Sequence, residues 1–188
     1  MKTAIVYYSM SGNTKYVADK IAEKIEADII RIEPVKVYPD KGAKRFIWGG
    51  MSAVMGEKPA LHPYEFNVEK YDRIIFGTPV WASNFAPPIR TFIKENPDIH
   101  EKKLAVFTCF SGGGADKAIE KMTVVLFIVG VLLGGSITRW YILNGHFSGS
   151  LVMNYRLESE NLMQLELSRD VNEVAKEKYI VLHVITRK

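Results

Sequence analysis

Four short apolar runs alternate with helical segments over the first part of the chain, and this alternation limits the possible folds more than any other feature. The runs span residues 4–8, 29–32, 73–76 and 104–109. Because none of them alternates with polar residues, each is expected to be buried on both faces, as in a parallel sheet covered by helices. Between the runs, apolar residues recur three and four positions apart. We therefore predict an α/β fold with a doubly wound parallel sheet. The apolar helical positions are Val17, Ile21 and Ile25, then Ile89, Phe92 and Ile93, then Ala115, Ile119 and Met122.

The chain loses this regularity in two places. Residues 34–63 are rich in proline and glycine, and they predict a long loop with a short helix over residues 44–54. Beyond residue 122, either residues 123–131 or residues 137–143 could form the fifth buried strand. The rest of the tail predicts a half-exposed strand at residues 151–157, a helix at residues 162–178 and a strand-like run at residues 179–185.

Composition excludes several classes of protein. Hydrophobic residues make up 47% of the 188 residues, enough for a real core. With a single Cys, the chain can form no internal disulfide and no cysteine-based zinc or iron–sulfur site. The net charge of +4 comes from scattered lysines and arginines, which argues against nucleic acid as a partner. His62, His100, His146 and His183 lack metal-ligand spacing, so we expect no metal.

One segment raises the question of a membrane. Residues 124–135 are apolar throughout. As a helix this segment would be about 18 Å long, well short of the ~30 Å hydrocarbon core of a bilayer. A buried strand or a core helix is therefore the better interpretation, with no stable membrane span. The lone Cys and the lack of a signal-peptide pattern predict a cytoplasmic protein.

Three loops follow predicted strands, and ligands bind at the carboxyl ends of the strands in open parallel sheets. The first loop, residues 9–14, places three hydroxyls, a glycine and an asparagine before a predicted helix starting near Lys15. Backbone N–H groups and the helix dipole suit a phosphate there, although an ordinary capped helix would show the same pattern. The P-loop lysine of nucleoside triphosphate hydrolases is absent.

The other two loops differ in character from the first. The second loop, residues 77–88, contains Trp81, Phe85 and three prolines, and would offer a flat aromatic ligand a stiff apolar wall. The alternative is that both aromatic side chains simply cover the core. The third loop, residues 110–115, contains three consecutive glycines that let a ligand approach the backbone closely, or that form a flexible turn.

Together the three loops resemble the flavodoxin-like family. The resemblance rests on residues 5–14 (IVYYSMSGNT), residues 75–81 (IFGTPVW) and residues 110–114 (FSGGG), and it covers roughly residues 2–122. It implies a three-layer α/β/α sandwich that binds one non-covalent FMN. The phosphate would be held by Ser9, Met10, Ser11, Gly12, Asn13 and Thr14. The isoalloxazine would be lined on one side by Thr78, Pro79, Val80 and Trp81, with Phe110, Ser111 and Gly112 near its other edge.

The resemblance implies a redox function. The leading interpretation is an FMN-dependent oxidoreductase that carries electrons or hydride from NAD(P)H or a protein donor to a quinone-like or protein acceptor. A non-enzymatic flavodoxin electron carrier and a flavin-free binding module are the alternatives. In carriers of this family, the surroundings of the ring tend to be acidic. Here neither the second nor the third loop contains Asp or Glu, and this absence of acidic residues favours reductase chemistry. A homodimer is possible.

The resemblance does not extend to the tail. We expect one domain over residues 1–188, with a well-matched core in residues 1–122 and an atypical C-terminal third in residues 123–188. The tail is either a divergent, enlarged ending or the product of a shifted reading frame. Three residues near the proposed site, Arg45, Arg90 and Lys94, could meet an anionic substrate or a dinucleotide phosphate, or form ordinary solvated surface. Cys109 is interpreted as a buried core thiol.

Overall fold

The fold is known from a computed structural model. It describes residues 1–38, 44–110, 113–132, 152–157 and 179–186, with side chains for residues 1–38, 49–110 and 113–126. The order of elements begins with β1 (Thr3–Tyr7), α1 (Asn13–Ile25), β2 (Asp28–Arg31), α2 (Lys44–Val54), the short 3-10 helix η1 (Val68–Lys70), β3 (Arg73–Trp81) and β4 (Asn84–Phe85). It continues with α3 (Pro87–Glu95), the 3-10 helix η2 (Pro97–Glu101), β5 (Lys103–Phe110), α4 (Ala115–Leu132), β6 (Val152–Leu157) and β7 (Tyr179–Thr186).

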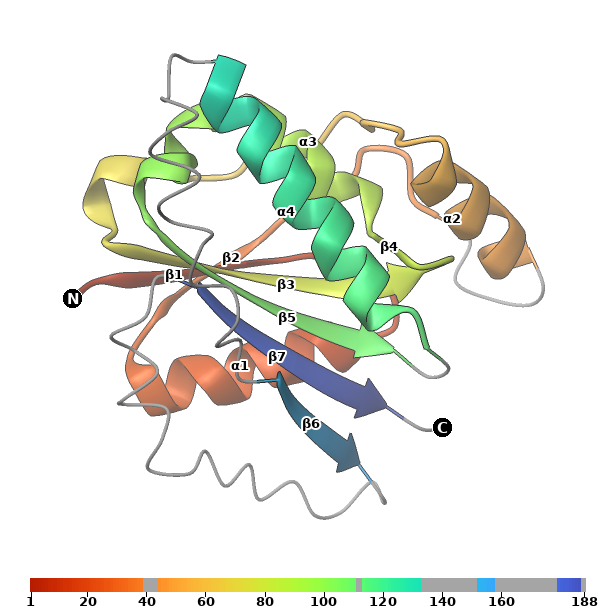
Figure 1. Cartoon of the computed structure of the whole chain (residues 1–188), viewed down its shortest axis with the longest axis horizontal. Helices are drawn as coiled ribbons and strands as arrows, with labels where there is room; N and C mark the ends of the chain where they lie inside the picture. Colours follow the sequence, from red (N-terminus) through yellow and green to blue (C-terminus); the bar gives the residue numbers. More distant parts are fainter. Residues whose placement is uncertain (39–43, 111–112, 133–151, 158–178, 187–188) are drawn as a thin grey trace.

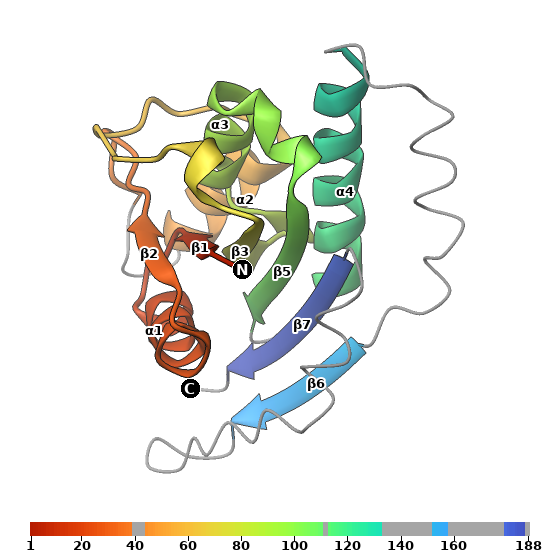
Figure 2. The same ribbon diagram turned by 90° about the vertical axis from the view of Figure 1, so that its left-hand side faces the viewer.

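The strands form one sheet in the order β2-β1-β3-β5-β7-β6, in which all neighbours are parallel. The short strand β4 pairs antiparallel with the end of β3, outside this row. In Figure 1, α1 covers one face of the sheet, α3 and α4 cover the other, and α2 stands to one side near β4. Figure 2 shows the same layers after a 90° turn about the vertical axis. The predicted doubly wound three-layer fold is confirmed.

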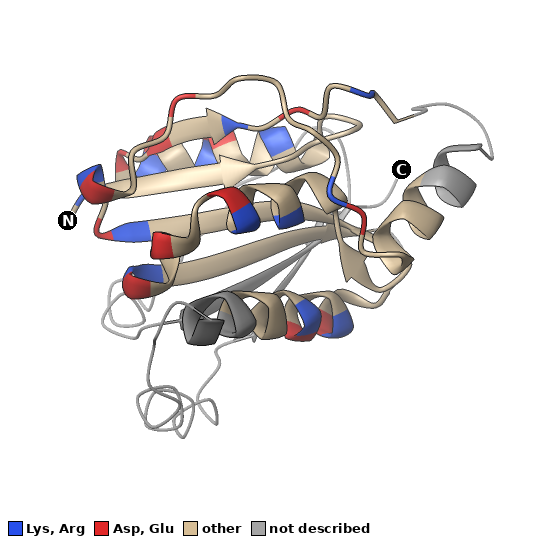
Figure 3. Cartoon of the chain, turned by 90° about the horizontal axis from the view of Figure 1, so that it is seen from above, with Lys and Arg blue, Asp and Glu red and all other residues tan. Residues whose placement is uncertain are grey.

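Two apolar clusters explain why β1, β3 and β5 are buried on both faces. The expectation fails for β2, which lies at the end of the strand order and buries only Ile30. Side chains alternate along β1, so Ile5 and Tyr7 face α1 while Ala4 and Val6 face the opposite layer. The α1 layer contributes Val17, Ala18 and Ile21 to its cluster. On the other face, α3 contributes Ile89, Phe92 and Ile93, and α4 contributes Ile119, Met122 and Leu126. Charged residues lie mainly on helices and loops, and the strands are largely uncharged (Figure 3).

Gly77 fixes the spacing of the central strands on the α1 side. It pairs with Tyr7 on β1 and with Phe107 on β5. A Cβ at this position would lie 2.3 Å from Phe107 Cζ and 2.9 Å from Tyr7 Cβ. Only glycine leaves room here for the Phe107 ring to lie across the neighbouring strand.

The tail corrects one expectation and bears out two. Residues 123–131 are part of α4 and do not form the fifth strand, because the apolar run continues the helix that begins at Ala115. The predicted strands at residues 151–157 and 179–185 correspond to β6 and β7, and β7 takes the place beside β5. The alternative strand at residues 137–143 and the helix at residues 162–178 lie outside the described residues. In the described part of the chain, no helix has both the length and the apolar character needed to cross a membrane.

Candidate functional site

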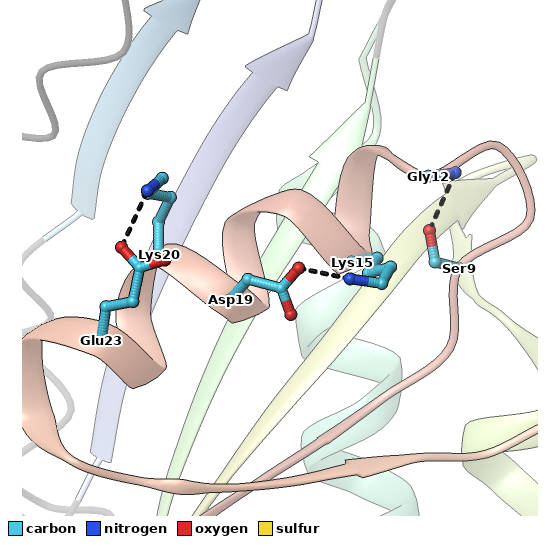
Figure 4. Close-up of polar contacts among 6 residues, drawn as sticks. All are labelled: Ser9, Gly12, Lys15, Asp19, Lys20 and Glu23. Carbon is cyan, nitrogen blue, oxygen red and sulfur yellow. Dashed lines mark hydrogen bonds and ion pairs between the residues drawn. The ribbon is translucent and has the colours of Figure 1, made fainter.

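The first loop folds into a tight turn before α1 (Figure 4). The Gly12 backbone N–H donates to Ser9 Oγ over 3.1 Å, which closes the loop on itself. Gly12 has φ of +91°, a conformation that L side chains rarely adopt, and a Cβ there would meet nothing within 4 Å. The glycine is thus required by the backbone angle and not by lack of space.

The start of α1 offers neutral hydrogen-bond donors to an anion. The first helical bond runs from the Tyr16 N–H to the Gly12 carbonyl at 2.9 Å, and no described side chain caps the helix. Lys15 is directed along the helix to Asp19, with Nζ 2.5 Å from the carboxylate, and away from the loop (Figure 4). An anion at this turn would therefore be met by backbone N–H groups, hydroxyls and the helix dipole.

Thr14 connects the first loop to the core. Its side chain is buried and forms a hydrogen bond with Cys109, at the end of β5. Burial raises the pKa of the Cys109 thiol to about 12, and the hydrogen bond from Thr14 opposes this shift. The thiol is consequently protonated at neutral pH, as expected for a core cysteine. Elsewhere in the loop, Met10 packs against the core and Ser11 is exposed.

The second loop begins inside strand β3 and turns back as a hairpin with β4. Thr78 is fully buried, and its Oγ1 donates to the Pro79 carbonyl at 3.0 Å and accepts from the Ala86 N–H at 2.9 Å. Its side chain therefore holds the hairpin together and has no exposed surface for a ligand. Pro79, Val80 and Trp81 are partly exposed.

The tip of this hairpin is conformationally strained. Ala82 and Ser83 have φ of +48° and +56°, so two residues with side chains occupy a region that usually takes glycine or asparagine. Asn84 Nδ2 donates to the Ala82 carbonyl at 2.8 Å and helps to hold the turn. Backbone strain of this kind is concentrated at functional sites in proteins.

Trp81 belongs to an aromatic cluster with Tyr8 and Tyr38. The ring centroids of Tyr8 and Tyr38 lie 5.7 Å and 5.1 Å from that of Trp81, both in edge-to-face geometry. On α2, a Cβ at Gly49 would lie 3.3 Å from the Trp81 ring, so the helix backbone packs closely on the indole. The cluster thus joins three segments that are distant in sequence.

A chain of hydrogen bonds holds the Tyr38 hydroxyl in place. The Tyr38 hydroxyl lies 3.0 Å from Ser52 Oγ, and Ser52 donates to the Glu57 carboxylate at 2.5 Å. Burial is the main cause that raises the pKa of both Tyr38 and Tyr8. Both phenols therefore stay protonated at neutral pH and offer an uncharged wall.

The structure brings the three loops together at the carboxyl ends of β1, β3 and β5. The Tyr8 N–H donates to the Gly77 carbonyl at 3.1 Å, which joins the first two loops. A Cβ at Gly114 would lie 2.4 Å from Ser83 Oγ, which shows that the third loop abuts the second. Phe110 is partly exposed, and Ser111 and Gly112 lie outside the described residues. In the part of the chain that is described, no three metal-ligating side chains gather.

Sequence reasoning missed the contribution of Tyr8, Ser52 and Glu57 to this site. Tyr8 lies in the motif that predicts the first loop, but its contact with Trp81 depends on how the strands pair. Tyr38 stands out in sequence only through the turn-forming Tyr-Pro-Asp pattern. Nothing local indicates that Ser52 and Glu57 support it, since these contacts form only when α2 packs against the hairpin.

Comparisons with known proteins agree with this geometry. The family model for flavodoxin matches residues 2–147, further along the chain than the expected resemblance to residue 122. A flavoprotein from Lactobacillus acidophilus, solved in complex with FMN, is 25% identical, with a TM-score of 0.60 over 66% of this chain and 85% of its own. A Bacteroides uniformis protein classed as a flavoprotein is 27% identical, with a TM-score of 0.56 over 65% and 81%. The fold, the matched residues and the predicted motifs agree, and the chain belongs to the flavodoxin family.

Proposed function

We propose that this chain binds one FMN where the three loops meet and acts as an FMN-dependent oxidoreductase. The observation that carries the proposal is the junction of an uncapped helix start with an aromatic wall at one edge of the sheet. The helix start would bind the phosphate, and the aromatic wall would lie against the flat ring system. The FMN held by the Lactobacillus acidophilus flavoprotein supports the same assignment.

The residues present supply the chemistry that FMN needs. On the phosphate side, Ser9, Ser11, Asn13 and Thr14 bring side-chain or backbone donors, and Gly12 leaves open space. On the ring side, Pro79, Val80 and Trp81 would line one face, and Phe110 with Ser111 and Gly112 the other edge. Met10 and Thr78 would act by positioning, since Met10 packs on the core and Thr78 is fully buried.

The protein would hold the cofactor and leave it accessible to redox partners. FMN supplies one- and two-electron redox chemistry when bound. Within the described parts of the second and third loops there is no Asp or Glu, and the charged Glu57 reaches the aromatic cluster only through Ser52 and Tyr38. This neutral environment supports transfer from NAD(P)H or a protein donor to a quinone-like or protein acceptor. We also propose a cytoplasmic location.

Binding of FMN and turnover test the proposal separately. Purified protein should be yellow, and it should oxidise NAD(P)H with a quinone when no other reductase is added. Trp81→Leu should weaken FMN binding about tenfold, because it removes an aromatic surface worth ~1 kcal/mol or more. Tyr64→Leu is the matched control, since Tyr64 packs on Phe92 away from the loops. Colourless protein that takes up no FMN would refute cofactor binding, and flavin without turnover would indicate a carrier.

A further inference from the structure

Arg90 is a half-buried cation that no described acidic group neutralises. It is the fourth residue of α3, and its Cζ lies 4.5 Å from the centroid of the Phe85 ring. Among the residues that the structure describes, its guanidinium forms neither a hydrogen bond nor an ion pair. Burial lowers the pKa of Arg90, and no neighbouring charge contributes to that shift.

A half-buried charged guanidinium destabilises the folded state unless an anion or hydrogen-bond acceptors pair with it. A guanidinium stays charged and carries five N–H donors, and the contact with an aromatic face satisfies none of them. Arg73, which is buried, donates to Met1 Sδ at 3.6 Å and has further partners. Lys15 and Lys20 each have a carboxylate partner. Arg90 therefore differs from these cations, because none of its donors has a partner among the residues whose side chains are described.

The acidic residue that follows Gly56, Glu57, is engaged elsewhere. Gly56 follows α2 and faces Arg90, since a Cβ there would lie 3.9 Å from Arg90 Cζ and Nε. Its neighbour Glu57 accepts from Ser52 in the chain that supports Tyr38. The Glu57 carboxylate is thus tied to the aromatic cluster, and Gly56 brings no side-chain acceptor to the guanidinium.

Arg90 adjoins the same two segments that carry the aromatic wall. α2 meets Trp81 at Gly49, and the chain reaches Arg90 at Gly56 just beyond the helix end. Trp81 and Arg90 therefore both lie against the segment that runs from α2 to Gly56. Phe85, which underlies the guanidinium, pairs with Val80 in the same hairpin that carries Trp81. Figure 1 shows α2 beside this hairpin and α3 directly after it.

We propose that Arg90 binds the oxyanion, carboxylate or phosphate, of the molecule that exchanges electrons at this site. The inference rests on the proposed function and specifies its substrate class. Phe85 would hold the guanidinium in place, and the N–H donors would form charge-assisted bonds with the oxyanion. Two sources share this chemistry, a phosphate of the nicotinamide donor and a carboxylate of the acceptor.

Steady-state kinetics of FMN-loaded protein distinguish these sources. Arg90→Met keeps an apolar side chain over Phe85 and removes the charge. Lys24→Met makes the same loss of charge at an exposed position on α1, across the sheet from α3. Arg90→Met should raise the KM of the anionic substrate about 10- to 100-fold with little change in kcat, as for a lost charge-assisted hydrogen bond. A change with NADPH and not with NADH identifies the 2′-phosphate, and a change with both identifies the diphosphate that the two share. A change with a carboxylated and not with a neutral quinone identifies a carboxylate. Unchanged KM for every substrate would overturn the inference.

A binding measurement without turnover gives an independent test. Benzoate and adenosine 2′,5′-bisphosphate are each titrated into FMN-loaded protein. At least one of the two should raise the melting temperature of wild type and of Lys24→Met. Neither should raise that of Arg90→Met. Equal shifts in wild type and Arg90→Met, or no shift with either ligand, would contradict the inference. If the protein takes up no FMN, the proposed function fails, and benzoate titration of the FMN-free chain still decides whether Arg90 binds an oxyanion.

Discussion

The first and second loops build neighbouring parts of the same site by different physical means. The first loop is short and polar, and its shape comes from one glycine with positive φ, one hydrogen bond to Ser9 and the start of a helix. The second loop is apolar and its shape depends on packing, with Trp81 between Tyr8, Tyr38 and α2. A local motif is enough for the polar loop, whereas the aromatic wall exists only in the assembled fold.

The largest expected effect concerns the buried base of the first loop. Burial raises the pKa of the Cys109 thiol from 9.0 to about 12, so the native thiolate at pH 8 should be about a thousandfold scarcer than in unfolded chain. Alkylation should be slowed accordingly, as measured with iodoacetamide in buffer and in urea. Equal alkylation rates in buffer and in urea would show that Cys109, below the first loop, is not buried.

The same pKa shift makes stability depend on alkaline pH. Because the folded pKa lies above the unfolded value, the protonated thiol contributes its full stability below about pH 9. That contribution is lost as the pH rises towards 12. Urea melts at increasing pH should show a steeper loss for wild type than for Cys109→Ala. Identical slopes would contradict the assignment.

The next largest effect is at the base of the second loop. Gly77→Ala forces a Cβ against Phe107 and Tyr7, and should lower the free energy of unfolding by about 3 kcal/mol. Gly50→Ala is the control, because its new Cβ would make only an ordinary 3.7 Å contact with Ala82. In the interior of α2 that change should raise stability by about 0.5–1 kcal/mol. Denaturant melts that rank the two variants the other way would contradict the packing argument.

Backbone angles at the two loops predict smaller effects of opposite sign. Gly12→Ala places a side chain at φ of +91° and should cost about 1 kcal/mol, although space is available. Ser83→Gly relieves a residue at φ of +56° and should stabilise the chain by about 0.5 kcal/mol. Thermal melts of the two variants measure both changes. Shifts of the same sign would show that backbone angles do not distinguish the loops.

The smallest effect is expected at the exposed ion pair on α1. Lys15→Gln removes the contact with Asp19, and surface pairs of this kind add little. Both the melting temperature and the affinity for FMN should stay within experimental error of wild type. A clear loss of FMN binding would mean that Lys15 turns from Asp19 towards the cofactor.

The sequence predicted the centre of the sheet because β1, β3 and β5 are apolar on both faces. It failed at residues 123–131, where an apolar run fits a buried strand and a buried helix equally well, and packing of α4 on α3 decides the outcome. In the site, Ser9 and Gly12 follow from a local motif. The pairing of Tyr38 with Trp81 does not, since it depends on α2 folding back across more than forty residues of chain.

The central claim is that two different surfaces hold one cofactor, and paired titrations with FMN and riboflavin test it most directly. Riboflavin has the same ring system and no phosphate. Flavin fluorescence quenching should give riboflavin a Kd at least about 100-fold higher than that of FMN, because it forgoes the charge-assisted bonds of the first loop. Trp81→Leu should then weaken both ligands, and Gly12→Ala should weaken FMN alone. Equal affinities for FMN and riboflavin in wild type would contradict the account.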